Sequence, residues 1–417
     1  MREFFVKSKK NRIIGALIFL VFYLAAALCF FRAYKLGREL DSQYMAERWA
    51  GESDGEFAQI SCFMPADEKL QTSDINTFRT KLMSSLEEAS VENTSGLPFT
   101  DCWSCESSAK VYGAYSGTAD IIACGGNFFD FHPLRLVTGN YFSGDDLMQD
   151  NVLLDEDLAW LLFGGNDLEG QTVYIWNTPF RVAGVVARES DQGTEKAYQG
   201  GLGLFMSYDA FLDYGTSGSD ASSSGDTSSS GSGTSSSSSA SAVGITCYEV
   251  CLPDPVKNFA LGAVTDGFPI GGGEIVQNTG RFGIVRLLSI IKDFSLRSIH
   301  SGVEYAYWEN AARYMENKAA ILLLAGLLVM QIPVLMLLSA LVANLLWTAR
   351  KLRENVLPEF NETVEERVRR LERRQWERRH PESRPSSDRT AADALPADGQ
   401  EKGTKPESDI PEDSGLW

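Results

Sequence analysis

The sequence is poor in the residues and motifs that catalytic and nucleic-acid-binding proteins need. Only three histidines occur in 417 residues, and no acidic or cysteine residues surround them at metal-ligand spacing. The P-loop pattern GxxxxGK[ST] is absent, as are HExxH, GxSxG and SxxK. Basic residues number 38 against 56 acidic ones, and a net charge of −18 disfavours binding to phosphate backbones. We therefore expect no catalytic, cofactor-binding or metal-binding residues, no enzyme activity, no cofactor and no nucleic-acid partner.

Long apolar runs are also few, and a mean hydropathy of −0.15 excludes a membrane protein with many spans. The first run covers residues 13–31 and is just long enough to cross a bilayer. Several basic residues precede it, which places the N-terminus in the cytoplasm. A cleaved signal peptide is the alternative, but no small-x-small cleavage site follows the run. We predict an uncleaved transmembrane helix.

The second apolar run, residues 319–347, is too long for one upright span and too short for two. One tilted helix fits it best, and Pro333 should kink that helix. Gln331 and Asn344 are polar positions inside the run, and such side chains either bond locally or seek a partner on another helix. Basic residues follow the run, so both termini should be cytoplasmic and the large central region extracytoplasmic.

Cysteine usage bears on the compartment of this central region. Of seven cysteines, Cys29 lies in the first apolar run and the other six lie between the runs. An even number outside the membrane suits an oxidising compartment, with two or three disulfides or unpaired thiols. Cys102 and Cys105 form a CxxC pair, for which a redox dithiol or half of a metal site are the less favoured alternatives.

Within the central region, spacing predicts several elements. Residues 33–60 read as a stalk helix continuing from the membrane, and residues 74–90 as a helix with one apolar face and Asp74 as its cap. Asp155 should start a short helix that ends at Gly164. Short strands should follow, joined by a hairpin turn at residues 177–179. The amphipathic segment 282–300 is expected to pack onto the domain rather than lie on a membrane.

The run from residue 139 to 186 also resembles a known family. The residues that carry the resemblance are Gly139, Phe142, Val152, Leu153, Leu154, Asp155, Ala159, Leu162, Phe163, Gly164, Gly170, Gln171, Val173, Pro179, Phe180, Val182, Gly184 and Val185. Their order and spacing resemble the MacB-like periplasmic core domain of ABC-transporter permeases of the MacB and FtsX type. Residues 305–313 resemble the segment leading into the second membrane helix of such permeases. The resemblance covers roughly residues 1–348.

The resemblance implies an α+β extracytoplasmic domain between two transmembrane helices. It also implies a membrane subunit that couples a separate cytoplasmic ABC ATPase to motion of that domain, in a bacterial cell membrane and with a possible second permease subunit. MacB-like permeases have a third and fourth membrane helix, for which this sequence offers no segment. The missing helices leave three interpretations of this chain: a truncated subunit, a divergent subunit or a gene fragment. The alternative function is a two-pass binding, sensor or scaffold protein without transport activity.

The expected organisation follows from these observations. It comprises a basic cytoplasmic N-terminus (1–12), a first membrane helix (13–31), an extracytoplasmic domain (32–317) with a flexible Ser/Gly-rich insertion (215–243), a second membrane helix (318–348), a charged cytoplasmic helix (349–379) and a disordered tail (380–417). In the charged segment, Glu365 and Glu366 precede Arg369 and Arg370 by four residues, which favours ion pairs along a helix.

Overall fold

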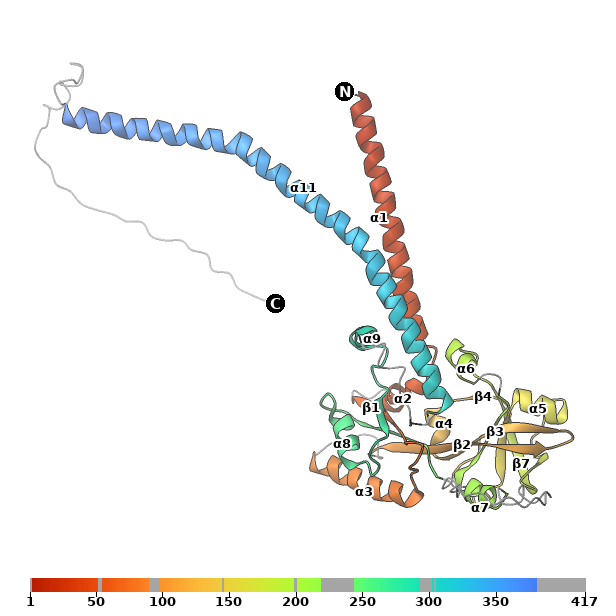
Figure 1. Ribbon diagram of the computed structural model, residues 1–417. Coiled ribbons are helices and arrows are strands. Elements are labelled where there is room, and N and C mark those ends of the chain that lie inside the picture. The colour runs from red at the N-terminus through yellow and green to blue at the C-terminus, as the bar shows by residue number, and fades with distance from the viewer. Residues whose placement is uncertain are drawn as a thin grey trace, which may run out of the picture. The chain divides into compact units, whose positions relative to one another are not determined.

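A computed structural model describes residues 2–51, 55–89, 98–144, 146–198, 201–218, 244–292, 302–303 and 305–380 (Figure 1). The insertion from 219 to 243 and the tail from 381 lie outside the described residues, as do residues 293–300 of the predicted amphipathic helix. Two compact units divide the chain, Met1–Val334 and Leu335–Trp417. The first contains the whole mixed α/β core domain, the helix before it and the start of the helix after it.

The domain is built on one sheet, whose strands run in the order β10-β1-β9-β2-β3-β8-β5-β7-β4. The strand bounds are β1 Phe57–Phe63, β2 Thr100–Tyr112, β3 Ser116–Gly126, β4 Arg135–Gly139, β5 Asn151–Asp155, β6 Thr172–Ile175, β7 Thr178–Ala187, β8 Gly203–Ser207, β9 Cys247–Pro253 and β10 Glu274–Gln277. The pairs β3–β8 and β5–β7 are parallel, and all other pairs are antiparallel.

One part of the sheet closes on itself. The short strand β6 pairs with β7 and also with the end of β2, so the pairings β2–β3–β8–β5–β7–β6–β2 form a ring. The hairpin between β6 and β7 turns at Trp176 and Asn177, whose φ angles are 48° and 65°. These left-handed values are those of a two-residue turn, one residue earlier than the sequence predicted. Outside the ring, β9, β1 and β10 extend the sheet from β2.

Helices cover both faces of the sheet. Their bounds are α2 Met45–Ala50, α3 Thr72–Glu88, α4 Phe128–Phe131, α5 Glu156–Phe163, α6 Gln192–Ala197, α7 Tyr208–Gly218, α8 Phe259–Gly267 and α9 Ile284–Lys292, with a 3-10 turn η1 at Asp41–Gln43. One apolar core includes the buried faces of α3, α5 and α8. A second includes α2 and α4 and reaches Trp308. Because strand residues alternate between faces, neighbours in a strand enter different cores.

The predicted helices α3 and α5 are confirmed. The buried side chains of α3 recur at the helical spacing that the sequence showed, namely Ile75, Phe78, Leu82 and Leu86. Its cap differs, because Gln71 is the N-cap and Asp74 accepts from the Gln71 backbone N–H in a capping box.

In α5, Asp155 caps the start by accepting from Leu158 N at 2.7 Å, and Gly164 ends the helix with φ 77°.

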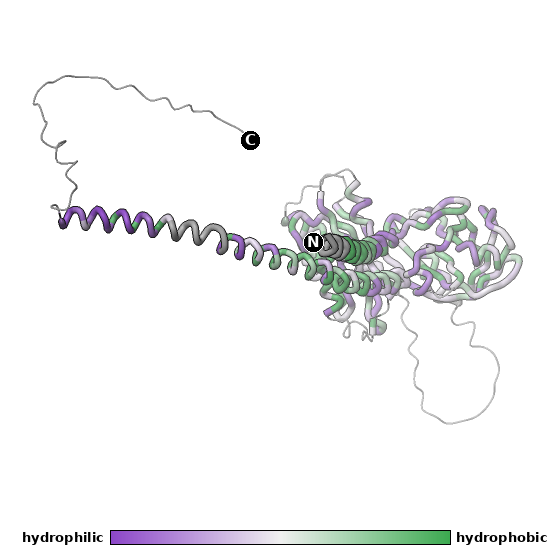
Figure 2. Tube along the Cα trace, turned by 90° about the horizontal axis from the view of Figure 1, so that it is seen from above, coloured by the Kyte–Doolittle hydropathy of each residue, from purple (hydrophilic) through white to green (hydrophobic). Residues whose placement is uncertain are grey.

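Two long apolar helices flank the domain, α1 (Arg2–Gly37) and α11 (Tyr307–Arg379). Figure 2 shows both coloured as hydrophobic over their membrane-length stretches, which are Ile13–Gly37 and Tyr307–Arg353. Helix α1 extends beyond the predicted end at residue 31, and α11 begins before the predicted start at 318. Helix α11 continues through Pro333.

In the second unit, exposed ion pairs join Arg369 to Glu365 at 3.3 Å and Arg370 to Glu366 at 3.1 Å, as predicted.

The predicted stalk helix over residues 33–60 is wrong. Helix α1 stops at Gly37, where a Cβ would come within 2.9 Å of Phe282. The chain then turns through η1 and α2 and enters β1, an inner strand of the sheet. The prediction overlooked the alternation of apolar Ala58, Ile60 and Cys62 with polar Gln59 and Ser61, which is typical of a strand.

Candidate functional site at the membrane junction

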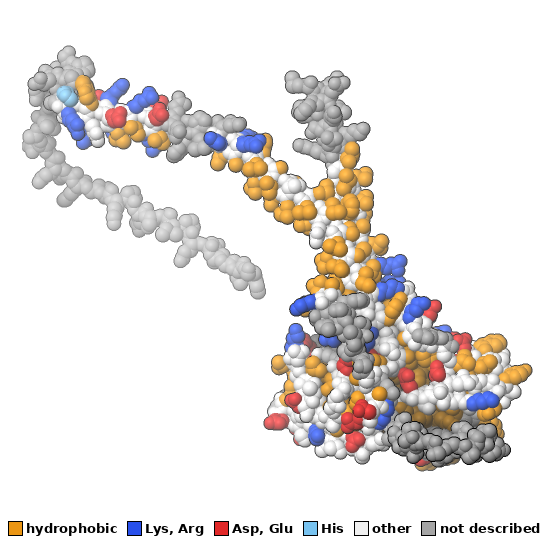
Figure 3. Space-filling view, in the orientation of Figure 1, with side chains coloured by type: hydrophobic (Ala, Val, Ile, Leu, Met, Phe, Trp, Pro, Cys, Tyr) orange, Lys and Arg blue, Asp and Glu red, His pale blue; other side chains and the backbone are white. Residues whose placement is uncertain are grey.

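The two long helices meet the domain at a packed junction. Leu36 and Leu40 at the exit of α1 pack with Ala311, Ala312 and Met315 at the start of α11. One turn further along α11, Ala319, Ala320 and Leu323 pack with Ala33 of α1 and with Leu287 and Ile290 of α9. Figure 3 shows hydrophobic side chains covering both helices next to this junction. Helix α9 therefore packs on α1 and α11, rather than only on the domain as the sequence suggested.

A buried arginine fixes the start of α11 to the domain. Arg281 follows β10, and its guanidinium contacts Glu309 through two hydrogen bonds of 2.6 and 2.7 Å. Its Nε lies 2.9 Å from Oε1 of Glu316, two turns further along α11. The side chains of all three residues are at most 1% exposed. Arg281 also donates to Gln43 Oε1 at 3.2 Å, so the same guanidinium contacts the segment that leaves α1.

Arg313 adds a second contact between α11 and the sheet. Its Nε donates to Glu309 at 2.6 Å, and its Nη2 donates to Glu274 of β10 at 2.6 Å. The guanidinium also lies over the ring of Tyr305, 4.0 Å from its centroid. Together, two arginines and three glutamates connect β10 and the segment after it to the first turns of α11.

The charges at this junction support one another. Burial by itself lowers the pKa of Arg281, but the nearby Glu309 and Glu316 carboxylates favour the charged guanidinium and raise that pKa above its ordinary value. Arg281 therefore stays charged at every physiological pH. A buried charge of this kind is stable only while its partners remain in place.

The polar contacts continue from the junction into the domain. Arg281 donates to Asn278 Oδ1 at 3.4 Å, and Asn278 donates to Ser61 Oγ of β1 at 2.7 Å. Ser61 in turn donates to Glu249 Oε1 of β9 at 2.5 Å. The other carboxylate oxygen of Glu249 contacts Nε2 of His132. A continuous chain of polar contacts thus joins the base of α11 to the middle of the sheet.

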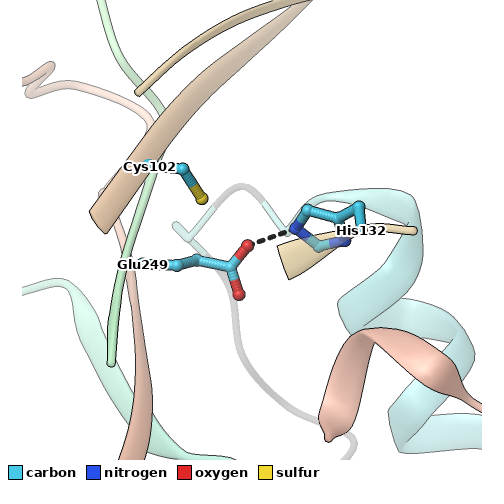
Figure 4. A group of neighbouring side chains, drawn as sticks. All are labelled: Cys102, His132 and Glu249. Atoms are coloured by element: carbon cyan, nitrogen blue, oxygen red, sulfur yellow. Dashed lines mark hydrogen bonds and ion pairs between the residues drawn. The ribbon is translucent and has the colours of Figure 1, made fainter. Parts of the chain in front are cut away.

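At the inner end of this chain, Cys102, His132 and Glu249 lie together (Figure 4). Cys102 is on β2 and stands directly opposite Glu249 of β9, while His132 follows α4. The His132 ring is enclosed by aromatic rings, with centroids 4.3 Å from Trp308 and 4.6 Å from Phe128. No sequence pattern indicates this cluster, because its members are far apart in the chain. Strand pairing brings them together.

The cysteines do not form the arrangements considered from the sequence. All seven are free thiols, so the expectation of disulfides is wrong, whereas that of unpaired thiols is met. Cys102 and Cys105 lie on one strand, three residues apart, and therefore face different cores. That separation excludes a shared dithiol or metal site for the CxxC pair. Burial raises the pKa of Cys105 and that of Cys251 to about 12, so both are protonated thiols.

A second group of polar residues, Asp155, Arg188 and Glu189, lies near Tyr307 at the start of α11. Asp155, besides capping α5, accepts from Arg188 at 2.7 Å and from Gly203 N at 2.6 Å. The neighbouring Glu189 accepts from the Tyr307 hydroxyl at 3.0 Å. Burial raises the pKa of Glu189 above its usual value, and the Tyr307 hydrogen bond partly offsets that rise.

The other residues singled out from the sequence have simpler places. Gln331 and Asn344 are exposed on α11. The residues that carried the family resemblance build the sheet and its turns. Gly139 has φ 75°, and a Cβ there would come within 2.1 Å of the Ala183 carbonyl oxygen on β7. Val152, Leu154 and Val182 are completely buried. These residues hold the fold together, as the sequence indicated.

Comparison with known proteins agrees with this architecture. Residues 53–242 match the family described as the MacB-like periplasmic core domain. A curated relative, the macrolide export ATP-binding/permease protein MacB of Aggregatibacter actinomycetemcomitans, is 34% identical over 108 residues. That match covers 25% of this chain and only 16% of the relative, so the chain spans about one sixth of the relative's length. This central part of the chain is a MacB-like periplasmic core domain.

Solved structures of similar domains are more distant in sequence. The periplasmic region of MacB from Actinobacillus actinomycetemcomitans is 19% identical and has a TM-score of 0.34, with 58% of this chain and 94% of that one covered. The extracellular domain of the noncanonic ABC-type transporter YknZ from Gram-positive bacteria is 12% identical and has a TM-score of 0.33, with 53% and 100% covered. The sequence matches relate the domain to the periplasmic core domain of MacB.

Proposed function

We propose that this chain is a membrane subunit of an ABC-type transport or mechanotransmission complex. In this role it would link a separate cytoplasmic ATPase to movement of its extracytoplasmic domain. The relative's name joins an ATP-binding part to a permease part, and this chain contains no P-loop. The ATPase would therefore be supplied by another chain.

The observation that carries the proposal is the buried ion cluster around Arg281. Movement can pass between a membrane helix and a domain only if the connection between them is stiff. Removing one partner of a buried ion pair typically costs about 3–5 kcal/mol, so Arg281, Glu309 and Glu316 hold α11 firmly against the sheet. A displacement of α11 at the membrane would therefore be passed to β10 and its neighbours.

The surface of the membrane helices supports a further subunit. In the most apolar stretch of each long helix, only 6% of α1 and 17% of α11 is buried within the chain. Gln331 is exposed near the middle of the apolar run, where lipid offers no hydrogen-bond partner. A second permease subunit would supply a partner for Gln331 and cover part of both helices. The chain would lie in a bacterial cell membrane, with both termini in the cytoplasm.

Affinity purification tests this proposal. The tagged full-length protein would be extracted from its native membrane in mild detergent, and copurifying proteins identified by mass spectrometry. We expect an ABC ATPase and a second permease, both absent from a parallel purification of an unrelated two-pass protein with the same tag. A well-folded protein that brings down neither would contradict the proposal. That result would favour a stand-alone membrane-anchored binding or sensor protein.

A further inference from the structure

The cluster of Cys102, His132 and Glu249 combines three metal-binding side chains in the interior. Their ligand atoms all lie within 4.8 Å of one another. Cys102 and His132 are 1% exposed, as is Glu249. Polar groups are rarely placed this deep without compensation, because burying an uncompensated charge is costly. We propose that these three residues form a buried site for a first-row divalent cation, with Zn²⁺ the best match. This proposal does not depend on the transport function.

The charges of the cluster favour a divalent cation. The buried Glu249 carboxylate has the His132 ring and the Ser61 hydroxyl as its polar neighbours, and the Cys102 sulfur lies beside them. A divalent cation bound to the thiolate, the carboxylate and a neutral imidazole gives a site with no net charge. Binding of the metal by a thiolate would release the thiol proton of Cys102.

The ligand types select among metals. One sulfur, one nitrogen and one oxygen suit Zn²⁺, which accepts cysteine, histidine and carboxylate ligands. Ca²⁺ and Mg²⁺ prefer oxygen ligands only, and Cu⁺ prefers sulfur. Zn²⁺ normally takes four ligands, so one position would be left for a small donor such as water.

Neighbouring groups hold two of the three ligands in position. Ser61 donates to Oε1 of Glu249, while Oε2 contacts His132 Nε2, so a metal bound by these two ligands would replace their direct contact. Trp308 and Phe128 enclose the His132 ring and restrict its rotation. Supporting contacts of this kind are typical of metal sites, whose ligands are oriented by an outer layer of residues. Trp308 belongs to α11, so a bound metal would also strengthen the attachment of that helix.

Metal analysis of the full-length protein tests the site. The protein, with a tag that contains neither histidine nor cysteine, would be purified in detergent, stripped with a chelator, loaded with Zn²⁺ and desalted. We expect about one zinc per chain by mass spectrometry of the metal, and a higher midpoint of thermal unfolding in the loaded protein. Loading with Co²⁺ instead should give a thiolate-to-cobalt charge-transfer band in the near ultraviolet.

Variants locate the metal. Cys102→Ala and His132→Gln should each lose the bound zinc, and Cys102→Ala should also lose the cobalt–thiolate band. The matched control is Cys251→Ala, which removes another fully buried thiol from the same core and should keep the metal. Equal zinc content in Cys102→Ala and Cys251→Ala would overturn the proposal. So would wild-type protein that retains no zinc and shows no cobalt–thiolate band, which is a result independent of whether any variant folds.

Discussion

At the scale of single residues, Arg281 is the position on which the attachment of α11 depends most. Replacing it with methionine fills a similar volume but leaves Glu309 and Glu316 buried without their main partner. We expect Arg281→Met to lower the free energy of unfolding by about 3–5 kcal/mol. Thermal or chemical unfolding of the detergent-solubilised protein measures the change.

An exposed arginine in the same unit provides the control. Arg38 contacts Glu47 at 2.8 Å, but the two side chains are 50% and 57% exposed. Exposed ion pairs contribute about 0–1 kcal/mol, so Arg38→Met should change stability little. If both variants lost the same stability, the junction would not owe its strength to burial of the ion cluster.

Glu189 should give stability a dependence on pH. Because burial raises its pKa in the folded state, the folded protein binds this proton more tightly than the unfolded chain does. The wild type should therefore lose stability as pH rises from the usual glutamate range through the raised pKa. Glu189→Gln removes this titrating carboxyl group, so the stability of the variant relative to wild type should increase between pH 4 and pH 7. Unfolding midpoints across this range measure the difference, with the exposed Glu195→Gln as control.

At the scale of elements, the contact between α1 and α11 depends on a glycine. A Cβ at Gly326 of α11 would come within 2.7 Å of the Phe30 ring on α1. We expect Gly326→Leu to force the helices apart and to cost about 1–3 kcal/mol, visible as a lower unfolding midpoint in detergent. Gly15 of α1 has no atom within 4 Å of its Cβ position, so Gly15→Leu serves as control. Equal midpoints for the two variants would show that the helices do not pack here.

The elements also show what could be predicted from the sequence and what could not. Spacing predicted α3 and α5, since Phe78 and Leu162 belong to regular apolar faces with local capping residues. Patterns in one segment carry no information about partners elsewhere in the chain. The pairing of Cys102 with Glu249, and the approach of His132 to both, depend on the order of strands. The junction was missed for the same reason, because Arg281 meets its partners only in the folded chain.

At the scale of the whole molecule, the free cysteines allow a test of the fold. The thiols outside the membrane helix are buried on two faces of the sheet, and none is bridged. The native protein should therefore react slowly with a membrane-impermeant maleimide. After denaturation with a chelator but without a reductant, all seven thiols should be alkylated, as counted by intact mass. A mass consistent with a disulfide after that treatment would show that the thiols pair.

The position of β9 has a consequence for how the protein folds. Strand β1 is made early, yet its neighbours are β9 and β10, which follow the Ser/Gly-rich insertion. The strands of the closed ring (β2, β3, β5, β6, β7 and β8) all lie between residues 100 and 207 and can pair before the insertion is made. Contacts between distant segments form slowly, so β1 must wait with an unpaired edge until β9 arrives. The last strands to pair, β9 and β10, thus complete the sheet just before α11 is made.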